Sequence, residues 1–186
     1  MFKIRHNINL FILILSLIGL SSGYIYYQIQ DQQTKDELIN AIDIKDELNS
    51  GINNIPKRIK IVTKIFFYGL TLIPQIINVF NIFYMPFEIG FILNLLESFS
   101  LKFSVIYITI YHIIPLIFTL LLIRISLKLS KFILELLVFK DKISIKNLRC
   151  SLKKYIFVSL LLFFYEFLLL IFSKNINTYL VVFFNK

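Results

Sequence analysis

The chain has 186 residues, of which 58 % are hydrophobic and 17 % are charged, and its mean hydropathy is +0.78. Soluble domains average about 45–50 % apolar and about 25 % charged residues, so this composition excludes a disordered chain and argues against a water-soluble globule. The basic residues behind the net charge of +9 lie between apolar segments, which is typical of membrane orientation signals rather than of nucleic-acid binding. We expect an all-α, polytopic helical membrane protein that forms a single membrane domain over residues 1–186.

The first predicted span covers residues 8–27, an uncharged run behind a short basic head. A helix of this length extends about 30 Å, which matches the hydrocarbon core of a bilayer. A cleaved signal peptide has a similar pattern. The run is long for a signal peptide, however, and the tyrosines at positions 24, 26 and 27 resemble an interfacial aromatic belt. We therefore expect the span to be retained.

Residues 28–60 form the longest polar segment, and we expect them to be an outer loop. Within residues 31–48 the apolar side chains of Leu38, Ile39 and Ile42 recur at helical spacing. This spacing predicts a short amphipathic helix outside the membrane. The three apolar residues are the candidate contact surface for an extracytoplasmic partner.

Three apolar segments follow the outer loop. We expect a second span over residues 61–85, ended by Pro86. The next stretch, residues 87–99, is short, and its length fits a tilted span, a re-entrant helix or the continuation of a broken helix. Residues 103–123 predict a further, complete span.

A basic segment and a last span complete the chain. Residues 124–154 carry nine Lys and Arg against two acidic residues, and the first half of this loop predicts a basic interfacial helix with one polar stripe. Residues 155–172 predict the last span. The positive-inside rule puts the basic head and the basic loop in the cytoplasm. The expected protein is therefore a multi-pass protein of the cell membrane with about five transmembrane helices, its N-terminus cytoplasmic and its C-terminus extracytoplasmic.

Motifs that carry catalytic chemistry are absent from the sequence. It contains no glycine-rich phosphate loop, no HExxH, no CxxC and no GxSxG, and it has two histidines. The single cysteine, Cys150, excludes an internal disulfide. We expect no enzyme activity, no cofactor and no metal site.

Polar residues inside the predicted spans are the remaining candidate site. His112 and Glu166 lie at depths that differ by only about 5 Å, one helical turn, so a contact between their helices is feasible. Such a pair fits a proton or ion relay, a conformational latch, or a packing hydrogen bond that fixes helix register. Asn78 and Asn81 are candidates for further hydrogen bonds between helices.

Five short, mostly apolar motifs lie between Gly69 and Lys131. They are Gly69-Leu70-Thr71-Leu72-Ile73-Pro74, Glu88-Ile89-Gly90-Phe91-Ile92-Leu93, Leu101-Lys102-Phe103-Ser104, Tyr111-His112-Ile113-Ile114-Pro115 and Arg124-Ile125-Ser126-Leu127-Lys128. In this order they resemble the stage II sporulation protein M family of low-GC Gram-positive bacteria. The resemblance implies a non-enzymatic membrane scaffold, which anchors or recruits cell-wall remodelling proteins like the stage II sporulation proteins D and P during engulfment.

Two other functions are open at this point. The chain also fits the membrane permease subunit of an ABC-type transporter, with residues 125–139 as the cytoplasmic coupling helix and with His112 and Glu166 along the path. It also fits a small structural membrane protein without a defined partner. In each case we expect the chain to lie in the lipid bilayer and to bind no nucleic acid.

Overall fold

The structure is a computed structural model that describes residues 2–41, 54–70, 75–97, 101–139 and 142–184. Almost all of these residues are helical, which confirms the predicted all-helical fold. The helices are α1 (Phe2–Ile29), α2 (Gln32–Ala41), α4 (Asn54–Gly69), α5 (Gln75–Glu97), α6 (Leu101–Ile108), the π-helical segment η2 (Thr109–Ile113), α7 (Ile114–Phe139) and α8 (Lys142–Phe184).

Four helical segments of the described chain are long and apolar enough to cross a membrane. They are Ile8–Ile29, Gln75–Leu96, Ser104–Val138 and Ile145–Phe172. Large apolar side chains cover the outside of these segments; Phe80 and Leu160, for example, are 68 % and 61 % exposed. An exposed apolar surface of this extent is unfavourable in water and favourable in lipid. The fold is therefore that expected of a helical membrane protein.

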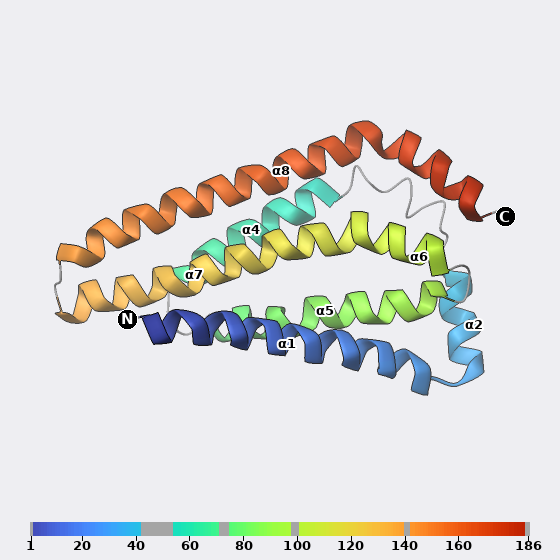
Figure 1. Ribbon diagram of the computed structural model, residues 1–186, viewed down its shortest axis with the longest axis horizontal. Coiled ribbons are helices and arrows are strands. Elements are labelled where there is room, and N and C mark those ends of the chain that lie inside the picture. Colours follow the sequence, from blue (N-terminus) through green and yellow to red (C-terminus); the bar gives the residue numbers. More distant parts are fainter. Residues whose placement is uncertain (1, 42–53, 71–74, 98–100, 140–141, 185–186) are drawn as a thin grey trace.

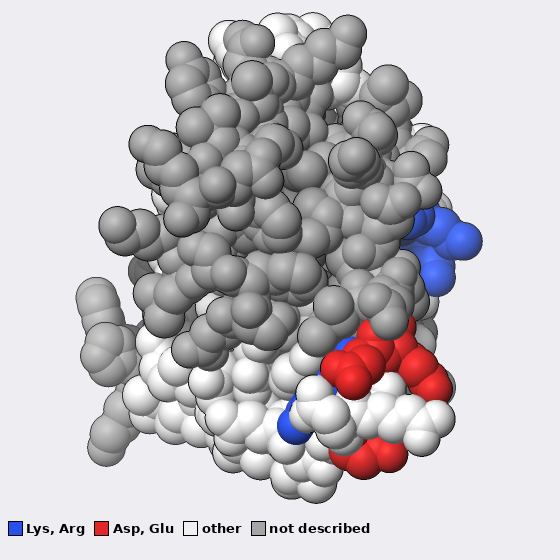
Figure 2. All heavy atoms as spheres, turned by 90° about the vertical axis from the view of Figure 1, so that its right-hand side faces the viewer, with Lys and Arg blue, Asp and Glu red and all other residues white. Residues whose placement is uncertain are grey.

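The long helices form two layers, and α4 packs mainly against α7, with further contacts to α5 and α8. In Figure 1, α1 and α5 lie side by side and run in the same direction, while α7 and α8 form an antiparallel hairpin. The short helix α2 lies across the end of the molecule where α1 stops. Figure 2 shows acidic side chains gathered at this end, where Asp31, Asp36 and Glu37 lie on or beside α2.

Glycine residues allow α1 and α5 to pack closely. A Cβ atom at Gly23 would overlap the carbonyl oxygen of Phe87, and one at Gly90 would overlap the carbonyl oxygen of Leu20. A Cβ atom at Gly19 would meet the backbone of α5 in the same way. Small residues four apart bring helix backbones together in membranes, where packing replaces the hydrophobic effect as the main force between helices.

The helix boundaries differ from the predicted second and third spans. The structure places a helix end at Gly69, inside the predicted span 61–85, and α5 then runs without a break through Pro86 to Glu97. The prediction that Pro86 ends a span is therefore wrong, and the described part of the stretch 87–99 continues the helix that begins at Gln75. A proline removes one backbone hydrogen bond, but membrane helices tolerate it when neighbouring helices pack around the site; Pro86 is buried here.

The described residues of the predicted basic loop 124–154 are also helical. The chain continues the span of residues 103–123 as a helix to Phe139, and α8 begins at Lys142 and includes the predicted span 155–172. Between Leu116 and Phe139 no glycine or proline interrupts the helical pattern. The basic segment is therefore the tip of the α7–α8 hairpin.

The outer segment is described only in part. Residues 32–41 form α2, within the predicted outer loop 28–60. The oxygen Oδ1 of Asp31 accepts a hydrogen bond of 3.2 Å from the backbone N–H of Thr34, so Asp31 caps the start of this helix. The side chains of Leu38 and Ile39, and the whole of Ile42, lie outside the described residues.

Candidate functional site

The helix α4 begins partway along the bundle instead of at its end. Figure 1 shows its first residues beside the middle of α8, and from there the helix runs parallel to α7. One face of α4 is buried at Val62 and Ile65, whereas Lys57, Ile59 and Lys60 are exposed. The position of α4 decides the site, because it brings Arg58 within reach of Glu166 on α8.

Polar side chains from α5 and α7 hold the C-terminal end of α4. Ser126 donates its hydroxyl to the carbonyl oxygen of Ile65 at 2.8 Å, and Ser130 donates to that of Gly69 at 2.6 Å. The Nε2 atom of Gln75 donates to the carbonyl oxygen of Tyr68 at 2.9 Å. The last carbonyl groups of a helix lack intrahelical partners, and the bonds to Tyr68 and Gly69 satisfy two of them in an apolar environment where water is scarce.

An ion pair joins the other end of α4 to α8. The Nε atom of Arg58 donates to Oε1 of Glu166 at 3.0 Å, and the side chains are 22 % and 6 % exposed. An isolated charge is costly in an apolar interior, so each group depends on the other. The tyrosine hydroxyl of Tyr155 adds a second link from α8, a 2.6 Å bond to the carbonyl oxygen of Val62.

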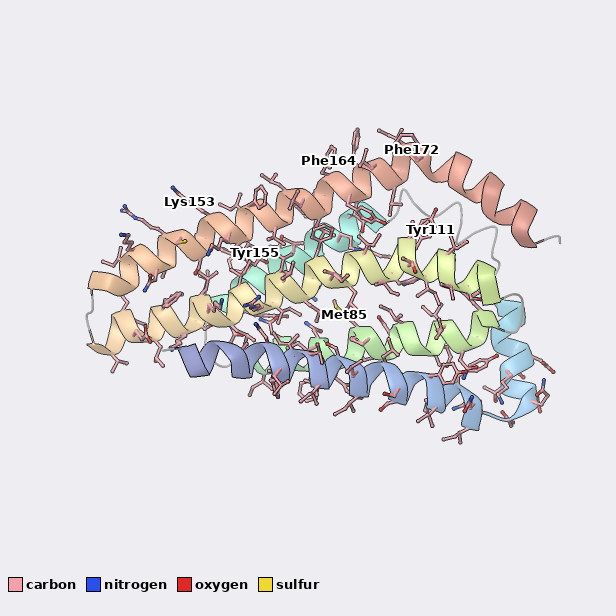
Figure 3. The ribbon with its side chains drawn as sticks, viewed as in Figure 1. Met85, Tyr111, Lys153, Tyr155, Phe164 and Phe172 are labelled. Atoms are coloured by element: carbon pink, nitrogen blue, oxygen red, sulfur yellow. The ribbon has the colours of Figure 1, made fainter. Side chains whose placement is uncertain are left out.

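A cavity of about 700 Å³ lies beside this ion pair. The residues that line it come from α1, α4, α5, η2 and α7. In Figure 3, Met85 lies on α5 between the two layers, whereas Phe164 and Phe172 on α8 point away from the bundle. The polar and titratable lining residues are Tyr26, Lys57, Arg58, Tyr84, Glu88, His112 and Thr119, and the apolar ones are Ile61, Met85, Phe87, Ile89, Phe91, Ile92 and Leu116.

His112 reaches the cavity from the π-helical turn η2. The N–H of Ile114 bonds to the carbonyl oxygen of Thr109, five residues earlier, just before Pro115. Proline lacks an N–H and its ring crowds the preceding turn, so a widened turn relieves the conflict. The imidazole ring of His112 also lies 5.7 Å from the ring of Tyr107.

The predicted polar residues therefore have different surroundings. His112 lines the cavity, but the described residue that binds the carboxylate of Glu166 is Arg58, not His112. Asn78 is fully buried and its Nδ2 atom donates to Ser126 Oγ at 3.1 Å, so it joins α5 to α7. Asn81 is half-buried on α5.

Sequence reasoning missed Arg58, Lys57 and Glu88. The predicted outer loop 28–60 includes both basic residues, and Glu88 enters the sequence analysis only as part of a family motif. The signal for Arg58 was its spacing, because it lies three and seven residues before Ile61 and Ile65 and hence on the buried face of the same helix.

The cavity has the chemistry of a binding site. Cationic side chains from α4 and a carboxyl group from α5 meet aromatic rings there. Among the residues that the structure describes, no three His, Cys, Asp or Glu side chains are grouped closely enough to hold a metal ion.

Comparison of the chain with protein-family models, curated proteins and solved structures finds no match. The resemblance to the stage II sporulation protein M family, and the function it implies, therefore stay predictions from the five motifs.

Proposed function

We propose that the chain is a non-enzymatic, multi-pass membrane protein that binds a small polar ligand inside the bilayer, as the membrane subunit of a transport system. The observation that supports this function is the charged cavity. Ionisable side chains within membrane spans are costly, and in membrane proteins they typically mark substrate or ion pathways. Glu88 belongs to the span Gln75–Leu96 and His112 to the span Ser104–Val138, and both line the cavity.

The proposed topology has five crossings, one of them short. The helices α1, α5 and α8 run in one direction and α7 runs in the other, so the chain must return once more between α1 and α5. The described element that runs this way is α4, whose 16 residues extend about 24 Å, less than the hydrocarbon core. With the basic α7–α8 tip in the cytoplasm, the N-terminus is inside and α2 and the C-terminus are outside.

Co-purification tests this function. The tagged full-length chain is extracted in mild detergent and the retained proteins are identified by mass spectrometry. We expect a cytoplasmic ATPase, held through the basic tip, and we expect Lys153→Glu to reduce its recovery. Lys153 lies on α8 and is exposed, and Lys35→Glu on α2 is the matched control. Recovery that both substitutions leave unchanged, or no ATPase at all, contradicts the transport function.

The scaffold function implied by the family resemblance is the second candidate. The acidic end of the molecule around α2 favours it, because this end offers a charged surface outside the membrane in the proposed topology. For this function we expect cell-wall hydrolases in the same co-purification. Replacement of Leu38, Ile39 and Ile42 by Asp is expected to release them without unfolding the spans, and their retention contradicts the scaffold function.

A further inference from the structure

The walls of the cavity carry charges of both signs. Lys57 and Arg58 come from α4 and Glu88 comes from α5. The side chain of Glu88 is exposed although it belongs to a membrane span. It lies eight residues before the end of that span at Leu96, about 12 Å along the helix, and it lines the cavity.

The charges of these groups nearly balance. Glu166 neutralises Arg58 through the ion pair, which leaves the ammonium group of Lys57 and the carboxylate of Glu88 as the remaining charges on the wall. A ligand with a single sign of charge would satisfy one of them and leave the other unpaired, at a high cost in a medium of low polarity. A ligand with both signs satisfies both.

The cationic side of the cavity suits a phosphate group. Arg58 uses Nε for Glu166, and among the described residues nothing bonds its terminal nitrogens. The guanidinium fork matches tetrahedral oxyanions, and a lysine ammonium nearby adds a point charge. Glu88 suits an ammonium group, because Tyr26, Tyr84 and Phe87 line the same cavity, and aromatic faces attract cations.

We propose that this cavity binds an amino-phosphate zwitterion, with the phosphate at Lys57 and Arg58 and the ammonium group at Glu88. The inference rests on the proposed function and names its ligand class. The same chemistry comes from two sources, the headgroup of phosphatidylethanolamine and free phosphoethanolamine. The apolar lining residues Ile89, Ile92 and Leu116 offer contacts for the beginning of acyl chains.

Native mass spectrometry of the detergent-solubilised full-length chain tests the proposal. The probes are phosphatidylethanolamine and phosphatidylglycerol with identical acyl chains, and free phosphoethanolamine as a competitor. We expect phosphatidylethanolamine to be retained roughly tenfold more strongly than phosphatidylglycerol, as for one good polar contact. If free phosphoethanolamine displaces the lipid, the site recognises the soluble molecule; if it does not, the site recognises the lipid headgroup.

Paired substitutions assign the effect to the cavity. Lys57→Gln and Glu88→Gln are each expected to abolish the preference for phosphatidylethanolamine. Lys60→Gln, on α4 but outside the cavity lining, and Glu37→Gln, on α2, are expected to preserve it. Glu88→Asp keeps the carboxylate and is expected to keep part of the preference, which separates loss of the ligand contact from loss of folding.

Three results overturn the proposal: equal retention of the two lipids, a preference that survives Glu88→Gln, or a preference that Glu37→Gln removes equally. The proposed function fails separately. If no ATPase co-purifies while the preference for phosphatidylethanolamine depends on Glu88, the binding site is supported and the transport function is contradicted. If the ATPase co-purifies but the two lipids bind equally, the proposed amino-phosphate ligand is contradicted and the transport function is supported.

Discussion

At the scale of single residues, the Arg58–Glu166 ion pair is the feature with the largest energetic consequence. It connects residues 108 positions apart in sequence, and Glu166 is almost fully buried. A buried pair contributes little relative to apolar side chains of the same size, because both charges must be desolvated. Loss of one partner, in contrast, leaves the other charge without compensation.

Glu166→Gln is therefore expected to lower the free energy of unfolding by about 3 kcal/mol, the lower end of the range for broken buried pairs, because Arg58 keeps some exposure. The double substitution Arg58→Met with Glu166→Leu is expected to recover most of this loss. Denaturant unfolding in detergent micelles measures the free energy of unfolding of the single and the double variant. A double variant as unstable as the single one would show that the pair itself, not its desolvation, governs stability.

Asp31 makes a pH-dependent contribution at the start of α2. The hydrogen bonds from Thr34 hold the pKa of the Asp31 carboxyl below its usual range. A carboxyl group whose pKa is lower in the folded state stabilises that state above its ordinary pKa, and the stabilisation is lost as the pH falls through the lowered value. The amide resonance of Thr34 is expected to report this transition in an NMR titration.

The matched variant for this titration is Asp31→Asn, which keeps a capping oxygen but does not ionise. We expect it to keep the start of α2 helical and to remove the pH dependence of the Thr34 resonance. A transition that persists in Asp31→Asn would have to come from another group.

At the scale of helices, the contact between α1 and α5 depends on the absence of side chains. Gly23→Ala is expected to destabilise the protein by about 1–3 kcal/mol, the usual cost of an inserted group in a packed contact, because the new Cβ would overlap the Phe87 carbonyl. The control is Ser21→Ala, since Ser21 is exposed on the same helix. Thermal unfolding in detergent measures both, and equal melting temperatures for the two variants would contradict the close approach.

The sequence predicts the helical class well and the helix boundaries less well. Long apolar runs such as residues 8–27 specify membrane helices by length alone. Pro86 misleads, because a proline that ends a helix in water is tolerated in a packed membrane helix. The partner of Glu166 also escapes prediction, since pairing between distant segments is set by tertiary packing, whereas hydrophobic periodicity is local. Gly19 and Gly23 lie four residues apart, a spacing that indicates close packing against another helix, as observed with α5.

At the scale of the whole molecule, a short helix packs beside α7 and α8 and pairs its Arg58 with the buried Glu166 of α8. Polar bonds from α5 and α7 fix one end of α4, and the ion pair with Glu166 fixes the other. The cavity lies beside the second of these attachments. A cavity with charged lining residues and an apolar outer surface are the two properties from which the proposed binding function follows.

Thiol accessibility in membrane vesicles tests both properties most directly. In a Cys150→Ser background, His112→Cys places a thiol at the cavity and Leu160→Cys places one on the exposed apolar surface of α8. A small, charged methanethiosulfonate reagent reacts only where water reaches the thiol. We predict reaction at position 112 and none at position 160, with the unsubstituted chain, labelled at its exposed Cys150, as the positive control. An unreactive thiol at position 112, or a reactive one at position 160, would contradict a water-accessible cavity within a membrane-embedded bundle.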